Sequence, residues 1–336
     1  LSNLARRSAM PILALRILRP LIRKSEEAIR TLTDEEKTSY GASLIAIGSF
    51  QEAKGYLQES RLAQSIFFLA LMSMSQWKYL EAITLLRQYL QFHSVSEYQK
   101  RVACLNLASS YLVVGQAEEA QKIISEQLTT MDKSENRLIY FFFKELSVQY
   151  LIQEKQYNEA SLILQEITNT FHEASSIYKL TLDKWTLAIQ AYQQKLSKHL
   201  LLEQIQFLEA RAIKLQQYEV LRELDLYRTI FLQDTNSFIK LWYGTPYVEY
   251  LKRIQSTVSE VYQKPISIPN QYLWNPNRTQ STDKHGVYLN LISGKQVPNF
   301  EVSTSLDSVS KVSTRQVVPS FSLTHQLLYQ LCKDFY

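Results

Sequence analysis

Histidine and cysteine are the side chains that most often hold metals or act as nucleophiles, and in this chain they are scattered. The histidines are His93, His172, His199, His285 and His325, and the cysteines are Cys104 and Cys332. No two histidines are spaced as HxxxH, and no cysteine lies near one in sequence. This spacing favours neither a metal site nor a disulfide framework. The sequence predicts no metal and no cofactor.

The sequence also lacks the common signatures of catalysis and nucleotide binding. It contains no GxGxxG, no GxxxxGK[ST] and no GxSxG. Acid pairs such as Glu118-Glu119 stand where helices are expected to begin, and carboxylates there complement the helix dipole. We expect Cys104 to be a buried structural thiol and His325 to have no role. We therefore expect no enzyme, although a site assembled between distant helices is left open.

Composition indicates a folded protein without a membrane span. Hydrophobic residues make up 46% of the chain and charged residues 21%. No apolar run reaches the roughly 18 residues that a spanning helix needs. With no disulfide framework, a reducing cytoplasmic location is expected.

Positive charge is concentrated in residues 1–30. This segment holds Arg6, Arg7, Arg16, Arg19, Arg23, Lys24 and Arg30 against two glutamates. Its net charge of +5 equals that of the whole chain, so the remainder is formally neutral. We favour a basic terminal helix pair, interrupted at Pro11 and Pro20, with a solvated basic face. The alternatives are contact with an anionic membrane surface or with nucleic acid.

Prolines divide the chain into regions. They stand at positions 11, 20, 246, 265, 269, 276, 298 and 319, so residues 21–245 contain none and are expected to be almost entirely helical. From these breaks we predict four regions. They are basic N-terminal helices (1–30), a helical array with a closing helix near 246–263 (31–264), a proline-rich linker (265–285) and a small extension (286–336).

A short pattern recurs within the helical region. "GSFQEA", "SQWKYLEA", "GQAEEA" and "EKQYNEA" each combine a turn with an acid–alanine pair, and the alanines are Ala53, Ala82, Ala120 and Ala160. The pattern resembles the tetratricopeptide repeat, which implies a mainly α fold, a superhelix of antiparallel helix pairs. The resemblance covers roughly 35–165 and is weak over 166–245, where "QQYEVL" ending at Leu221 is at best a degenerate unit.

The resemblance can be followed residue by residue. Leu107, Ala108 and Tyr111 take the motif positions before the turn at Gly115. The small residues Gly41, Ala70, Ala108 and Ser147 take the place where adjacent helices approach closely.

Tetratricopeptide arrays bind partner peptides on the face formed by their first helices, so the resemblance implies a groove here. Mapped onto this chain, the groove is formed by Phe67, Leu71, Met74, Leu105, Ser109 and Leu112. These residues are unusually apolar for a solvent-lined surface. Either a protein or peptide partner covers them, or another segment does, such as the linker at 265–285 or the N-terminal helices.

Beyond the linker the texture changes. Residues 286–297 alternate like a strand with a hairpin turn, 301–318 form a second strand or a loop, and 320–336 form an amphipathic helix. The extension is thus expected to be a small α+β unit. Its last helix either docks on the array or begins a domain cut short at Tyr336, and we favour the second.

Two functions follow from these patterns. The leading one is a non-catalytic protein–protein interaction scaffold or regulatory module. The alternative is a transcriptional regulator, because the order hairpin, loop and helix resembles the start of a winged-helix domain in bacterial regulators. Residues 286–336 hold only Lys295, Lys311, Arg315 and Lys333 as cations, so we expect no nucleic-acid binding by the residues present.

Overall fold

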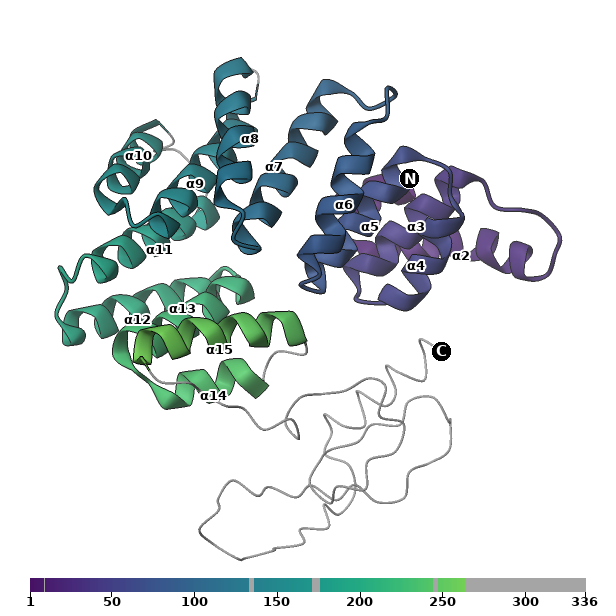
Figure 1. The fold of residues 1–336 in the computed structure, drawn as a ribbon. Helices are drawn as coiled ribbons and strands as arrows, with labels where there is room; N and C mark the ends of the chain where they lie inside the picture. Colours follow the sequence, from purple (N-terminus) through teal and green to yellow (C-terminus); the bar gives the residue numbers. More distant parts are fainter. Residues whose placement is uncertain (9, 133–135, 171–175, 244–246, 264–336) are drawn as a thin grey trace, which may run out of the picture. The chain divides into compact units, whose positions relative to one another are not determined.

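A computed structural model describes residues 1–263, apart from 9, 133–135, 171–175 and 244–246 (Figure 1). All of these belong to one unit, Leu1–Pro269. The linker, the hairpin and the final helix predicted beyond residue 264 lie outside the described residues. The winged-helix alternative, which depends on them, therefore stays a prediction.

The described residues form fifteen α-helices and no strand, which confirms the mainly α fold. The first eight are α1 Ser2–Arg7, α2 Pro11–Glu26, α3 Asp34–Ala46, α4 Phe50–Glu59, α5 Ala63–Ser75, α6 Tyr79–Leu90, α7 Glu97–Val113 and α8 Ala117–Thr130. The others are α9 Arg137–Gln153, α10 Tyr157–Thr170, α11 Ser176–Tyr192, α12 Lys198–Lys214, α13 Tyr218–Leu232, α14 Thr235–Tyr243 and α15 Val248–Tyr262. Consecutive helices pack in pairs, as Figure 1 shows for α3 with α4 and α12 with α13. The helix predicted over 246–263 is α15.

Seven helices end with one backbone motif. A residue with left-handed φ follows the helix, and the N–H of the next residue donates to the carbonyl five residues earlier. The left-handed residues are Ala28, Gly48, Trp77, Gly115, Lys155, Gln194 and Gln216. The donated bonds measure 2.8–3.0 Å, from Lys78 N to Ser73 O at 2.8 Å to Lys195 N to Gln190 O at 3.0 Å. This motif stops a helix and reverses the chain within a few residues.

The helix-pair array continues through the region where the sequence resemblance fades. The motif recurs at Gln194 and Gln216, and α13 also ends on a left-handed residue, Gln233. Counted from Trp77, the turn residues 77, 115, 155, 194 and 233 are 38, 40, 39 and 39 positions apart. In addition, α3 contacts α5, α7 contacts α9, and α11 contacts α13. From α5 to α13, the odd-numbered helices therefore end at a nearly constant interval.

The interruption expected at Pro20 is wrong. Helix α2 runs unbroken across Pro20, and Pro11 occupies its first turn. Proline in a helix interior removes one backbone hydrogen bond, but the buried residues Ala14, Leu18 and Ile22 hold α2 on the core. Packing thus offsets the lost bond. Among the described residues, no helix is long and apolar enough to cross a membrane.

The small residues predicted to permit close helix packing are buried. Gly41, Ala70, Ala108 and Ser147 are all buried. A Cβ added at Gly41 would lie 2.6 Å from Leu57 Cγ and 3.2 Å from the carbonyl oxygen of Ala53. Glycine is therefore required for the approach of α3 to α4.

Because of this packing, we expect two glycine substitutions to change the free energy of unfolding in opposite directions. Gly41→Ala should lower the free energy of unfolding by about 1–3 kcal/mol, because the new methyl overlaps the buried Leu57. Gly55→Ala in α4 meets nothing within 4 Å and should raise it by about 0.5–1 kcal/mol, because alanine is the better helix former. Urea unfolding of both variants measures the two changes, and equal effects would contradict the close approach.

Candidate partner-binding surface

The six predicted groove residues occupy equivalent places on α5 and α7. Counted back from the left-handed residues Trp77 and Gly115, they come in pairs ten, six and three residues before the turn. The pairs are Phe67 with Leu105, Leu71 with Ser109, and Met74 with Leu112. Five of the six are partly exposed, whereas Leu112 is only 2% exposed. The side chain of Leu112 therefore belongs to the core, and the other five remain candidates for contact.

The partly exposed members are held in place by the core beneath them. The centre of the Phe67 ring lies 5.2 Å from the centre of the Tyr89 ring and 6.1 Å from the centre of the Phe68 ring. Leu71 packs against the cluster that contains Phe68. Leu105 packs against the larger core cluster. These positions thus present a fixed apolar edge rather than freely moving side chains.

The same position carries charge further along the array. The residues ten before the turn are Glu145 in α9, Lys184 in α11 and Glu223 in α13. Lys184 Nζ donates to Glu223 Oε2 at 2.5 Å and lies 4.1 Å from the centre of the Trp185 ring. Trp185 Nε1 donates to Glu145 Oε1 at 2.9 Å. Side chains from three successive odd-numbered helices are thereby linked.

This charged layer was missed at the sequence level. Its members belong to no motif, and the signal that could have revealed them is their spacing of 39 residues. Desolvation raises the pKa of Glu145, although the Lys184 charge and the Trp185 hydrogen bond oppose the rise. Burial, followed by the Glu223 charge, raises the pKa of the nearby Tyr227 well above its usual value. At the position ten residues before the turn, the side chain therefore changes from apolar on α5 and α7 to charged on α9, α11 and α13.

Helix α15 returns to the ends of α5 and α7. The centres of the Tyr250 and Trp77 rings are 4.1 Å apart, and the Arg253 guanidinium donates to the Val113 carbonyl at 2.9 Å. Buried Ile254 and Val258 join the same apolar cluster. A segment distant in sequence thus contacts the turns next to the predicted groove. That segment is α15; the linker at 265–285 lies outside the described residues, so its place relative to the groove stays a prediction.

A pocket of about 680 Å³ lies where α15 meets these turns. Its wall includes Trp77, Lys78, Tyr79, Leu80, Glu81, Leu112, Val113, Val114, Gly115, Gln153, Glu249 and Arg253. Desolvation lowers the pKa of Arg253, and the neighbouring Tyr79 and Tyr250 oppose the change. The pocket combines aromatic rings with two cations and two carboxylates, which suits binding better than proton transfer.

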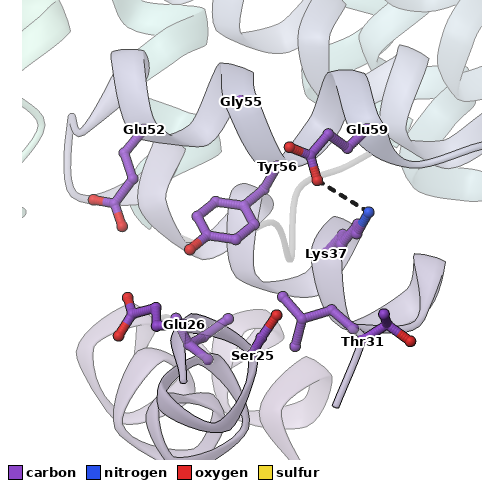
Figure 2. Close-up of a pocket in the computed structure, with 10 residues that line it drawn as sticks. Ser25, Glu26, Thr31, Lys37, Glu52, Gly55, Tyr56 and Glu59 are labelled. Atoms are coloured by element: carbon purple, nitrogen blue, oxygen red, sulfur yellow. Dashed lines mark ion pairs between the residues drawn. The ribbon is translucent and has the colours of Figure 1, made fainter. Parts of the chain in front are cut away.

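A second pocket, of about 420 Å³, lies between α2, α3 and α4. Figure 2 shows the Lys37–Glu59 ion pair, 3.0 Å long, at one side of Tyr56 and the carboxylates of Glu26 and Glu52 at the other. Desolvation and the charges of Glu52 and Glu26 raise the pKa of Tyr56. The three carboxylates would attract a cationic group, but no nucleophile is paired with a base there.

The residues considered for chemistry are not brought together. Cys104 lies in α7, where burial and then the Glu126 charge raise its pKa to about 11. His199 is exposed on α12, 3.7 Å from Glu203. No cluster of three or more potential metal ligands occurs in the described part of the chain.

Comparisons with family models, with curated proteins and with solved structures found no match to this chain. The helix-pair architecture therefore rests on the described geometry, and the tetratricopeptide resemblance rests on the sequence pattern.

The Trp77–Tyr250 contact can be separated from the backbone effect of the turn. Trp77→Gly removes the ring that α15 packs on, although glycine relieves about 1 kcal/mol of left-handed strain. We expect faster hydrogen exchange in α15. Lys155→Gly is the matched control, because Lys155 holds the same backbone conformation with an exposed side chain. It should raise the free energy of unfolding by about 1 kcal/mol and leave α15 exchange unchanged. Unchanged α15 exchange in Trp77→Gly would contradict the docking.

The raised pKa of Cys104 predicts a slow thiol. In a chain carrying Cys332→Ser, iodoacetamide should react with Cys104 far more slowly at neutral pH than in the urea-unfolded chain. The rate should climb by roughly tenfold per pH unit towards about 11, because only the thiolate attacks. A fast reaction at neutral pH would instead indicate an activated nucleophile.

Proposed function

We propose that residues 31–262 form a non-catalytic, tetratricopeptide-like scaffold or regulatory module that binds a segment of a partner protein along its odd-numbered helices. The helix pairs supply the framework, and the equivalent positions on α5, α7, α9, α11 and α13 supply the contact row. This proposal is supported by the order of side chains at the position ten residues before each turn, from apolar on α5 and α7 to charged on α9, α11 and α13.

The apolar half of the row carries the proposal. Phe67, Leu71, Met74 and Leu105 are partly exposed at matching places on consecutive odd-numbered helices. Covering this apolar edge with a partner lowers the free energy, because apolar surface is removed from water. The entropy cost of binding is small, because these side chains are already ordered by packing in the free protein. A segment with apolar side chains fits this half of the row.

The polar half would set direction. Lys184 is buried, and it pairs with the partly exposed Glu223, while the partly exposed Glu145 is bound to the Trp185 indole. A partner would therefore meet carboxylates that are held in place from beneath. Apolar groups of the partner would be excluded from this half, since they would leave polar atoms without hydrogen bonds. The partner segment would therefore place its apolar residues on α5 and α7 and its polar residues toward α13.

Photo-crosslinking in cells identifies the partner. A benzophenone amino acid replaces Phe67, which keeps an aromatic ring at the half-buried site. The matched control replaces Phe207, an aromatic residue 62% exposed on α12. We expect a protein that crosslinks at Phe67 and not at Phe207. Equal capture at both positions would contradict a specific row.

The purified partner is then titrated with two double variants. Leu71→Glu with Leu105→Glu should weaken binding by roughly 30-fold or more per position, the effect of losing a well-packed apolar contact. Leu162→Glu with Ile213→Glu changes two exposed residues on even-numbered helices and should leave the affinity unchanged. Circular dichroism checks that helicity is preserved. Unchanged affinity in the first variant would sink the proposed row.

A further inference from the structure

Exposed apolar side chains gather at the N-terminal helices. Seven of the seventeen large apolar side chains exposed in the described part of the chain lie within residues 1–29. Four of them belong to α2 or its start: Met10 is 47% exposed, Ile12 49%, Leu13 44% and Ile17 37%. Elsewhere such residues are mostly scattered singly along the helices, which needs no special explanation.

The inner face of α2 is already occupied. Ala14, Leu18 and Ile22 are buried, and the last two share a core cluster with Tyr40 and Leu44 of α3. The exposed apolar residues lie on the rest of the helix surface. The outward face therefore stays available while α2 remains packed in the fold.

Basic side chains lie among these apolar residues. Arg16, Arg23 and Lys24 are exposed, and none of them forms an ion pair among the described residues. Arg16 and Arg23 are seven residues apart, about two turns along one side of the helix. Leu13 and Ile17, four residues apart, share an adjacent strip. One helix thus presents an apolar strip beside a basic one.

We propose that the outward face of α2 binds the surface of an anionic phospholipid membrane. Leu13 and Ile17 would enter the boundary between headgroups and acyl chains, and Arg16, Arg23 and Lys24 would contact the headgroup phosphates and carboxylates. The helix would lie in the plane of the surface and would not span it.

Charge selects this occupant over the two others that an apolar face could take. The net +5 of residues 1–30 equals the net charge of the chain, so a second copy would bring the same cationic face and repel it. Nucleic acid would satisfy the arginines but would leave Ile12, Leu13 and Ile17 without an apolar partner. Of these three occupants, only an anionic lipid surface supplies both kinds of contact.

Co-flotation with vesicles tests the proposal on the complete chain. We expect binding to vesicles of phosphatidylcholine with phosphatidylserine, similar binding when phosphatidylglycerol replaces phosphatidylserine, and little binding to pure phosphatidylcholine. High salt should weaken the binding, because exposed charges are screened. An absence of binding to the anionic vesicles would overturn the proposal.

Paired variants locate the surface. Arg16→Ser with Arg23→Ser, and separately Leu13→Ser with Ile17→Ser, should each lower the partition constant by roughly tenfold or more. The charge control is Lys179→Ser with Lys214→Ser, and the apolar control is Leu162→Ser with Ile213→Ser. All four control residues are exposed on other helices, and both controls should bind as the parent chain does.

The remaining outcomes all count against the proposal. Equal losses in patch and control variants would mean diffuse binding. A dimer in light scattering that the Leu13→Ser/Ile17→Ser variant dissociates would assign the face to a second copy. Binding to duplex DNA that depends on the arginines and not on Leu13 or Ile17 would assign it to nucleic acid.

Thermal melts of each variant show whether a loss reflects unfolding. A variant that melts early is replaced by Leu13→Ala or Arg16→Gln, which disturb the helix less.

Discussion

The left-handed residue that follows each of α3, α5, α7, α9 and α11 is the constraint on which the rest of the fold depends. The N–H that follows it bonds to a carbonyl five residues earlier, so the helix stops and the chain reverses. The second helix must then lie against the first. In the pairs α3–α4, α5–α6, α7–α8 and α9–α10, an alanine five residues after the turn residue is fully buried. These are Ala53, Ala82, Ala120 and Ala160. Turn and alanine together fix the register of each of these pairs.

This dependence explains how much of the fold the sequence could predict. The sequence pattern of a turn followed by an alanine at a fixed position could be recognised from residue 48 to residue 160. That part of the array was predicted correctly as helix pairs. The motif needs a backbone conformation rather than a residue type. Glycine adopts it without strain at Gly48 and Gly115, but Gln194 and Gln216 adopt it as well, at a modest cost. The sequence pattern therefore becomes weak after residue 165, although the helix pairs continue. Pro20 was misjudged for a related reason, because tertiary packing held α2 together where local preference favoured a break.

The candidate site divides in the same way. The six groove residues were mapped by register, and the structure places them at equivalent positions, although Leu112 is buried. The Glu145–Lys184–Glu223 layer could have been found only from the 39-residue interval between its members. The sequence pattern was too weak after residue 165 to reveal that interval. The contact between Trp77 and Tyr250 joins residues far apart in the chain, and no local pattern encodes it. Sequence could predict that a closing helix exists near residue 250, but not which turns it would contact.

The two proposed surfaces use different helices, and this separates their consequences. The contact row belongs to α5 and its odd-numbered successors, whereas the basic apolar face belongs to α2. Helix α2 is attached to the array through Leu18 and Ile22, which pack with α3 and leave the outward face unused. Because α3 also contacts α5, α2 and the contact row are joined through packed helices rather than through a flexible tether. Lipid binding at α2 would therefore fix to the membrane the same packed body that carries the row. In that arrangement the scaffold would recruit its partner to an anionic surface, and each interaction would persist when the other is removed by substitution.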